Sequence, residues 1–194
     1  MRITLVVLVV LAVASGAAAG PLDAPGADKA VVCSACHGPG GQSPSNVMPI
    51  LAGMPSWYLK KAVQDYAAGR RPSPEMEPYA KQVLQLGVDE IAAYFSGQTR
   101  QPAAVRPDAA AVERGRAAAA QCVVCHAASG KGDPGKGIPD ITGQPQGYLQ
   151  SQMLLFKADR RSPGDESLKA LKAFFRQIAD EQIVDLAAYY SSLR

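Results

Sequence analysis

Two short motifs hold the residues of this chain that are best suited to redox or metal chemistry. Residues 33–37 (CSACH) and 122–126 (CVVCH) share the pattern Cys-x-x-Cys-His, and together they contain all four cysteines and both histidines of the 194 residues. Thiols and imidazoles with this spacing can form a disulfide, a redox-active dithiol, a zinc site or a covalent haem attachment. Because no histidine remains outside the motifs, chemistry that needs many imidazoles is excluded.

The pattern is the attachment signal of a c-type haem. Two thiols three residues apart on a helical turn reach the two vinyl groups, and the adjacent histidine ligates the iron. A thioredoxin-type site would need a βαβ context, which is absent, whereas a zinc site or a disulfide pair in a secreted chain would use similar residues. Two copies of the motif favour two haem c groups. The predicted covalent attachment residues are Cys33, Cys36, Cys122 and Cys125, and the predicted iron ligands are His37 and His126.

The motifs belong to an internal repeat. They recur at an offset of 89 residues, residues 48–53 (MPILAG) recur as 138–143 (IPDITG) at 90, and residues 91–95 (IAAYF) recur as 186–190 (LAAYY) at 95. Landmarks that match in the same order are typical of a tandem duplication. The chain is therefore predicted to consist of two copies of one small unit.

An export signal precedes the repeat. Arg2, the apolar run at 3–14 and the alanines at 17–19 are typical of a signal peptide, which predicts a periplasmic location. A retained membrane anchor is the alternative, although the run is short for a spanning helix. The stretch between the copies (GQTRQPAAVRPD) has no apolar period and predicts a linker. The predicted organisation is a signal peptide at 1–19, an N-terminal domain at 20–96, a linker at 97–108 and a C-terminal domain at 109–194.

Both halves show helical periodicity, and no stretch alternates convincingly as a strand would. Leu171, Phe175 and Ile178, for example, fall close to helical spacing. A loop-rich half of about 80 residues rarely buries enough apolar surface to be stable alone. It normally needs a further stabilising element, such as a disulfide, a metal or a large apolar cofactor. We therefore predict an all-α fold. The expected helices cover residues 27–36, 57–68 and 89–95 in the first half, and 109–125, 147–157 and 168–191 in the second.

These features resemble the dihaem cytochrome c4 family, which has tandem class I cytochrome c domains. The resemblance covers residues 27–194 and rests on the two motifs, on Pro-x-x-x-Gly at 49–53 and 139–143, and on the Ala-Ala-Tyr-aromatic helices. It implies two cytochrome c-like domains, each packed around one haem, with the haems close across the interface. It also implies that the backbone carbonyls of Pro49 and Pro139 accept the second ring N–H of the two motif histidines and fix the rings.

The sixth iron ligand of the first haem is predicted to be Met76. This methionine lies in the loop before the last expected helix of the first half, as Met-Glu-Pro-Tyr-Ala, and this placement resembles the distal methionine motif of the family. A His/Met pair raises the reduction potential and fills the sixth position, which suits electron transfer rather than catalysis.

The second half departs from this pattern. Counting back from the final helix places Leu171 opposite Met76, and leucine cannot ligate iron. Three alternatives are open: a five-coordinate iron, ligation by Lys172 or Lys169, or recruitment of Met153. Because an amine ligand or a vacant position lacks the preference for ferrous iron that a thioether gives, we expect the second haem to have the lower potential, so that electrons enter at the C-terminal half and leave from the N-terminal half.

The charge balance indicates protein partners rather than nucleic acid. Twenty basic residues against 17 acidic ones, with no long basic run, cannot form a phosphate-binding footprint. The expected partners are a redox donor and a redox acceptor. The resemblance suggests a terminal oxidase as one acceptor, with peripheral association with that membrane complex. The alternative function is a periplasmic oxidoreductase, or its haem subunit, for example in sulfur-compound oxidation, in which the second haem binds a ligand; whether any substrate is turned over is left open.

Overall fold

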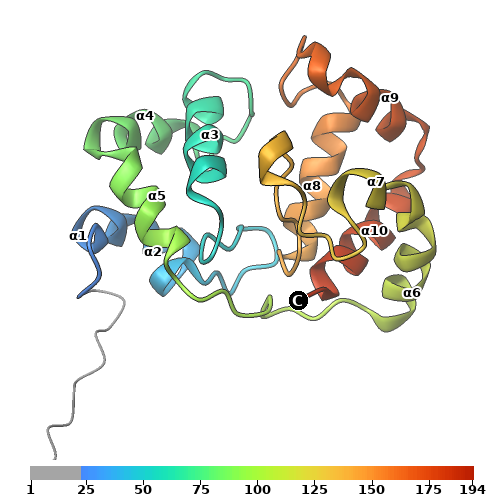
Figure 1. The fold of residues 1–194 in the computed structure, drawn as a ribbon, viewed down its shortest axis with the longest axis horizontal. Coiled ribbons are helices and arrows are strands. Elements are labelled where there is room, and N and C mark those ends of the chain that lie inside the picture. Colours follow the sequence, from blue (N-terminus) through green and yellow to red (C-terminus); the bar gives the residue numbers. More distant parts are fainter. Residues whose placement is uncertain (1–22) are drawn as a thin grey trace, which may run out of the picture.

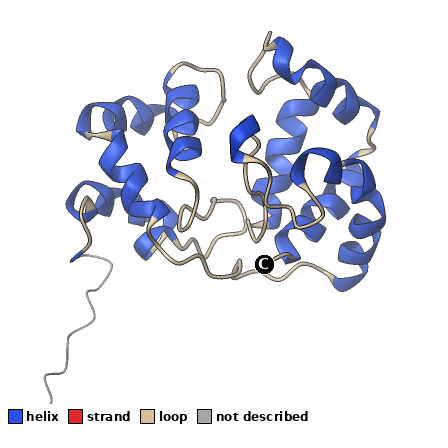
Figure 2. Cartoon of the chain, viewed as in Figure 1, coloured by secondary structure: helices blue, strands red, loops and turns tan. Residues whose placement is uncertain are grey.

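The computed structural model describes residues 23–194, and all regular elements of this part of the chain are helices (Figures 1 and 2). The all-α prediction is confirmed; the one β-bridge, between Asp133 and Ile138, is isolated. The predicted signal peptide at 1–19 lies outside the described residues. Within residues 23–194, no helix has both the length and the apolar character that a membrane crossing requires.

The helices form two groups that lie side by side in Figure 1, with loops between them. The first group contains α1 (Ala27–Ala30), α2 (Ser34–His37), α3 (Ser56–Ala67), α4 (Glu77–Leu86) and α5 (Val88–Ser96). The second contains α6 (Ala109–Ala118), α7 (Val123–His126), α8 (Gln146–Lys157), α9 (Lys169–Gln177) and α10 (Asp180–Ser192).

Each group has its own apolar core. In the first, α1, α3 and α5 pack around side chains such as Ala30 and Phe95, which are at most 1% exposed. In the second, α10 packs against α6 and α8, and Ile183 and Leu186 are equally buried. The final repeat segments thus form the central helix of each half, because their apolar residues face the core.

The structure differs from the predicted elements in two places. The single helix predicted over 168–191 is wrong, because Ile178 has an extended backbone (ψ 133°) that separates α9 from α10. Helix α4 was not expected, and it places Met76 at its N-cap rather than in a long loop. Its exposed Tyr79, Leu84 and Leu86 obscure the apolar stripe that Ala80 and Val83 form on the buried side. The remaining predicted helices are present with shifted ends, and the segments 27–36 and 109–125 are each broken into shorter pieces.

Side chains from the linker and from the loop after residues 138–143 connect the two halves. Gln144 is 2% exposed, and its side chain accepts from the Ile50 backbone N–H at 2.9 Å and donates to the Ile50 carbonyl oxygen at 2.8 Å. Arg100, in the predicted linker, donates to the carbonyl oxygens of Ala52 and Thr142, both at 3.0 Å. Backbone groups of one half are therefore satisfied by side chains of the other half and of the linker, which fixes how the halves meet.

Candidate haem-binding sites

The Cys-x-x-Cys-His motifs each occupy one helical turn, α2 in the first half and α7 in the second. All four cysteines are free thiols; Cys36 and Cys125 are exposed, whereas Cys33 and Cys122 are half-buried, and burial raises the pKa of both half-buried thiols. Among residues 23–194, no three His, Cys, Asp or Glu side chains converge on a metal-sized site. This geometry favours neither a disulfide nor a shared zinc site.

Both histidine rings are held by the carbonyl groups that the resemblance implies. His37 Nδ1 lies 2.9 Å from the Pro49 carbonyl oxygen, and His126 Nδ1 lies 3.2 Å from that of Pro139. A carbonyl oxygen can only accept, so Nδ1 carries the proton and Nε2 keeps its lone pair for a metal. Burial lowers the pKa of both rings, only partly offset by these hydrogen bonds, which favours the neutral form that ligation needs.

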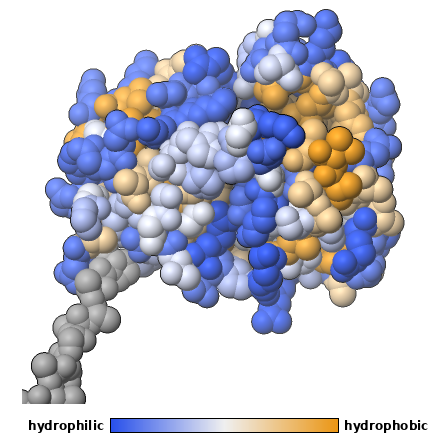
Figure 3. Space-filling view, in the orientation of Figure 1, coloured by the Kyte–Doolittle hydropathy of each residue, from blue (hydrophilic) through white to orange (hydrophobic). Residues whose placement is uncertain are grey.

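The surroundings of the two motifs are not equivalent. The residue after the histidine has positive φ in both halves, 74° at Gly38 and 59° at Ala127, so the second half places an alanine where glycine is favoured. The side chains between the cysteines are Ser and Ala in α2 but Val123 and Val124 in α7, and Val124 is 84% exposed. Figure 3 shows this apolar patch over α7. The second motif therefore presents the more apolar surface.

Met76 is half-buried at the start of α4 and is held locally. Its backbone N–H lies 3.1 Å from the Ser73 carbonyl oxygen and 3.2 Å from Ser73 Oγ. Among the methionines of the described chain, Met54 is 5% exposed and its sulfur is contacted by Arg100 at 2.8 Å and by Gln144 at 3.3 Å. Met54 thus serves the interface between the halves, whereas the Met76 sulfur has no hydrogen-bond partner among residues 23–194.

The matching position in the second half is arranged differently. Leu171 is half-buried within α9, which begins earlier relative to the repeat than α4 does. Lys172 is 4% exposed, and its Nζ donates to the Ser162 carbonyl oxygen at 2.5 Å and pairs with Asp159 Oδ1 at 2.6 Å. Asp159 and Ser162 have φ of 51° and 49°, so Lys172 braces a strained turn.

The other two distal candidates also have defined positions. Lys169 is exposed and pairs with Glu166 at 3.2 Å. Met153 is half-buried on α8 and packs against the core of the second half. Both lysines that the sequence predicts as candidates are therefore engaged by other groups, and Met153 lies on a different helix from Leu171.

A buried polar cluster lies between the two halves of the chain. Arg71 is 1% exposed, and it donates to Gln152 Oε1 at 3.0 Å and to the Tyr148 hydroxyl at 2.5 Å. Arg161 donates to the same Gln152 oxygen at 2.8 Å and to the Tyr58 hydroxyl at 3.1 Å. Neither arginine has a carboxylate partner in the described chain. Burial raises the pKa of Tyr58, but the two guanidinium groups lower it more strongly.

This cluster fits a haem cofactor. Two guanidinium groups that share neutral acceptors at a buried interface need a counter-charge, because an uncompensated buried cation is costly. Haem carries propionates that can supply it. Trp57 Nε1, in the residue next to Tyr58 at the start of α3, is likewise buried without a hydrogen-bond partner among residues 23–194. In the sequence, the cluster is indicated by the internal repeat, in which Tyr58 and Arg71 recur as Tyr148 and Arg161.

Comparisons with known proteins agree with this geometry. A model of the family described as cytochrome c matches residues 112–194. Cytochrome c4 of Pseudomonas aeruginosa is 31% identical over 177 residues, covering 88% of each chain. The thiosulfate dehydrogenase electron acceptor of Thiomonas intermedia is 34% identical over 160 residues, covering 77% of this chain and 70% of that protein. The crystal structure of reduced recombinant cytochrome c4 from Pseudomonas stutzeri superposes with a TM-score of 0.73 at 28% identity, covering 86% of this chain and 96% of that chain.

Proposed function

The chain belongs to the cytochrome c4 family of dihaem electron carriers and carries two haem c groups, and on this basis we propose that it shuttles electrons between redox proteins of the periplasm. In this proposal, residues 20–96 and 109–194 are the two domains. Cys33 and Cys36 attach the first haem, and Cys122 and Cys125 attach the second. His37 and Met76 ligate the first iron, and His126 ligates the second.

The observation that carries the proposal is how the two histidine-bracing loops meet. Pro49 braces His37, and the next residue, Ile50, is bonded through both its backbone N–H and its carbonyl to Gln144. Gln144 directly follows the segment that contains Pro139, which braces His126. The two proximal ligands are thus supported by loops in direct contact, which suits conduction between two cofactors held at a fixed separation.

The chain's own residues prepare the sites for electron transfer. Haem supplies one-electron redox chemistry. The Pro49 and Pro139 carbonyls orient the imidazoles and make them more basic, so that ligation is retained as charge changes. Arg71 and Arg161 present positive charge at the interface, where we place the propionates. Burial of Gln144 and Arg71 at this interface limits solvent reorganisation around the moving charge, which favours transfer.

The partners follow from the family and from one relative. The acceptor is proposed to be a terminal oxidase, reached by peripheral association with its membrane complex. The similarity to the thiosulfate dehydrogenase electron acceptor of Thiomonas intermedia supports a sulfur-compound oxidoreductase as donor. The second candidate function, an oxidoreductase or its haem subunit with a ligand-binding second haem, is favoured by Leu171 and by the other contacts of Lys172 and Lys169.

Redox titration of the holoprotein tests these proposals. We expect two one-electron steps, with the second haem at the lower potential, because Leu171 offers no thioether at the position that Met76 has in the first half. We also expect the reduced protein to bind about one carbon monoxide per chain, at the second haem. Domain-resolved absorption and magnetic circular dichroism spectra assign each step.

Each outcome of that experiment has a defined meaning. Two haems that titrate together at a high potential would overturn the assigned asymmetry. Absence of carbon monoxide binding would show that both irons are closed, which excludes the ligand-binding candidate and leaves a simple carrier. Continuous oxidation of a sulfur compound by the holoprotein, with an added artificial electron acceptor to take up the electrons, would overturn the carrier as the complete function.

The arginine cluster leads to a second prediction. Arg71→Gln is expected to lower the potential of at least one haem, because removing a buried positive charge favours the ferric state, and to destabilise the holoprotein by about 3 kcal/mol through the propionate left without its counter-charge. Potentials are measured by titration and stability by denaturant unfolding. Arg160→Gln is the matched control, because Arg160 is an exposed arginine with no side-chain partner among the described residues. Equal effects of the two variants would contradict the assigned role of Arg71.

A further inference from the structure

The two loops that brace the histidines differ by one charge. In the first half, Pro49 is followed by Ile50, which is fully buried, whereas the residue after Pro139 is Asp140. The Pro139 carbonyl that accepts from the His126 ring and the backbone nitrogen of Asp140 belong to the same peptide group. A carboxylate is therefore attached directly to the group that supports the proximal ligand of the second haem, and the matching residue of the first half is uncharged.

The Asp140 carboxylate is held in one orientation. Its Oδ1 accepts from the Thr142 backbone N–H at 2.8 Å and from the Thr142 hydroxyl at 2.7 Å. Its Oδ2 lies 3.3 Å from Lys131 Nζ and 3.3 Å from Arg100 Nη1. The Asp140 side chain is only 16% exposed. These contacts therefore fix a negative charge that solvent screens poorly.

The two cations near Asp140 do not remove the difference between the halves. The Lys131 side chain is 51% exposed, so water screens its charge more than it screens that of Asp140. Arg100 donates to the carbonyl oxygens of Ala52 and Thr142, both at 3.0 Å, and these two residues are equivalent in the repeat. The guanidinium group thus acts on both proximal loops, whereas the carboxylate belongs to one of them.

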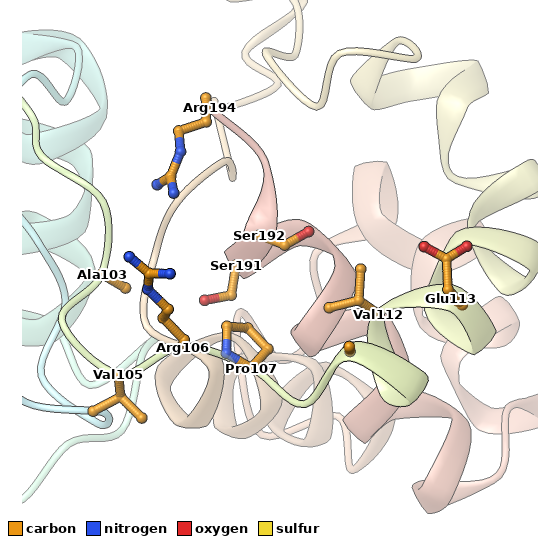
Figure 4. Close-up of a pocket in the computed structure, with 10 residues that line it drawn as sticks. Ala103, Val105, Arg106, Pro107, Val112, Glu113, Ser191, Ser192 and Arg194 are labelled. Atoms are coloured by element: carbon orange, nitrogen blue, oxygen red, sulfur yellow. The ribbon is translucent and has the colours of Figure 1, made fainter.

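The linker holds Arg100 in this shared position. The next residue, Gln101, donates its backbone N–H to Gln42 Oε1 of the first half at 2.9 Å. Further along, the linker passes the end of α10, where Val105 and Ser191 line one pocket (Figure 4). Contacts to both halves therefore flank Arg100 and keep its charge between them.

The Asp140 carboxylate also acts on the histidine ring itself. Burial lowers the pKa of both proximal rings, and the proline carbonyls offset part of this effect. At His126 the Asp140 carboxylate raises the pKa further, whereas at His37 the Pro49 carbonyl is the one opposing cause. The electrostatic surroundings of the two predicted iron ligands therefore differ in the same sense as the sequences of their loops.

From this arrangement we propose that Asp140 lowers the reduction potential of the second haem by fixing a negative charge beside the proximal support of His126. The inference rests on the proposed function, because it requires a haem at each motif. When the second site accepts one electron from the redox donor, its net charge falls by one, and a nearby anion opposes that change. This cause lies on the proximal side, so it is separate from the missing thioether at Leu171 and acts whichever distal ligand is present.

Redox titration of the holoprotein with domain-resolved spectra tests the role of Asp140. Asp140→Asn removes the charge but keeps an acceptor oxygen for both Thr142 donors. At an applied potential fixed at the second midpoint of the parent, we expect the ferrous-to-ferric ratio of the second haem to rise about three- to tenfold, or about 30–60 mV for one electron. The ratio at the first haem should not change. Lys131→Gln, which leaves Asp140 in place and removes a counter-charge, should lower the ratio at the second haem about twofold.

Asp133→Asn is the matched control, because Asp133 is a carboxylate of the same loop that is more exposed, at 42%. It accepts from the Gly135 backbone N–H at 3.0 Å and pairs with Lys136 at 3.3 Å. We expect this variant to leave the ratio at the second haem within about 1.5-fold of the parent, since solvent screens an exposed pair. Asp140→Glu keeps the charge and should also remain close to the parent.

The result that supports the proposal is a rise in Asp140→Asn together with a fall in Lys131→Gln, and any other pair of shifts in these two variants overturns it. An equal rise in Asp140→Glu and Asp140→Asn would also overturn it, because distortion of the loop rather than charge would then be the cause. A chain that carries no haem at the second motif would refute the proposed function as well. That case is recognised from absorbance and mass before any titration, so the two failures are distinguishable.

Discussion

Met76→Ala is expected to lower the potential of the first haem and to open its iron to carbon monoxide. The thioether is the group at this position that favours ferrous iron, and alanine cannot replace it. The potential should fall by a sizeable fraction of the roughly 0.8 V over which axial ligands tune haem. Carbon monoxide uptake by the reduced protein should rise from about one to about two per chain. Spectroelectrochemistry and carbon monoxide titration measure the two effects.

Met48→Ala is the control for this prediction. Met48 is also a half-buried methionine of the first half, but it lies before Pro49 on the proximal side of the site rather than at the start of α4. It should leave the first potential and the carbon monoxide stoichiometry unchanged. If Met48→Ala produced the shift and Met76→Ala did not, the assignment of Met76 as the sixth ligand would be wrong. Leu171→Met provides the reciprocal check in the second half, where a new thioether should raise the lower potential.

The sequence predicts the chemistry of the site better than its distal geometry. The cysteine and histidine positions follow from a contiguous motif, and each Pro carbonyl lies within 13 residues of its histidine, in a segment that the repeat marks. Glu77 and Pro78 are typical of the first turn of a helix and mark the start of α4. Its exposed apolar residues, however, hide the helical periodicity of the buried ones. The break at Ile178 involves neither proline nor glycine, and its one local signal is the acidic pair Asp180 and Glu181 in the first turn of α10.

Contacts between residues far apart in the chain account for the rest. The Gln144 bonds to Ile50 span 94 residues, and the Arg71 bond to Gln152 spans 81. A single sequence holds no information on such pairs except through the repeat, which aligns Met54 with Gln144 and so conceals their different roles. Lys172 shows the same limit, because its partners Asp159 and Ser162 could not be paired with it from spacing alone.

The crossing of α6 and α10 depends on a glycine that the sequence analysis did not single out. A Cβ on Gly115 would lie 2.0 Å from the Asp185 carbonyl oxygen and 2.8 Å from the Tyr189 Cβ. The first half repeats the arrangement, since a Cβ on Gly26 would lie 2.8 Å from the Glu90 carbonyl oxygen. The contacts are with backbone and with a Cβ, so no side-chain rotation relieves them. A close approach of two backbones therefore sets the helix crossing in both halves.

Gly115→Ala is accordingly expected to destabilise the C-terminal half by about 3 kcal/mol or more, because α6 and α10 must separate to admit the methyl group. The gain in helix propensity, about 1 kcal/mol, is too small to offset this. Denaturant unfolding of the holoprotein, followed by circular dichroism, measures the change.

The control for this variant is Gly97→Ala at the end of α5. Gly97 has φ −78°, and a Cβ there would lie 3.5 Å from the Ala93 carbonyl oxygen, an ordinary contact, so stability should be unchanged or slightly raised. Since Tyr190 of α10 lies beside the His126 ring, a loosened crossing should alter the spectrum of the second haem and leave that of the first unchanged. A Gly115→Ala protein as stable as the parent would show that the crossing can widen freely, and the backbone approach would then not be what fixes α10 against the second site.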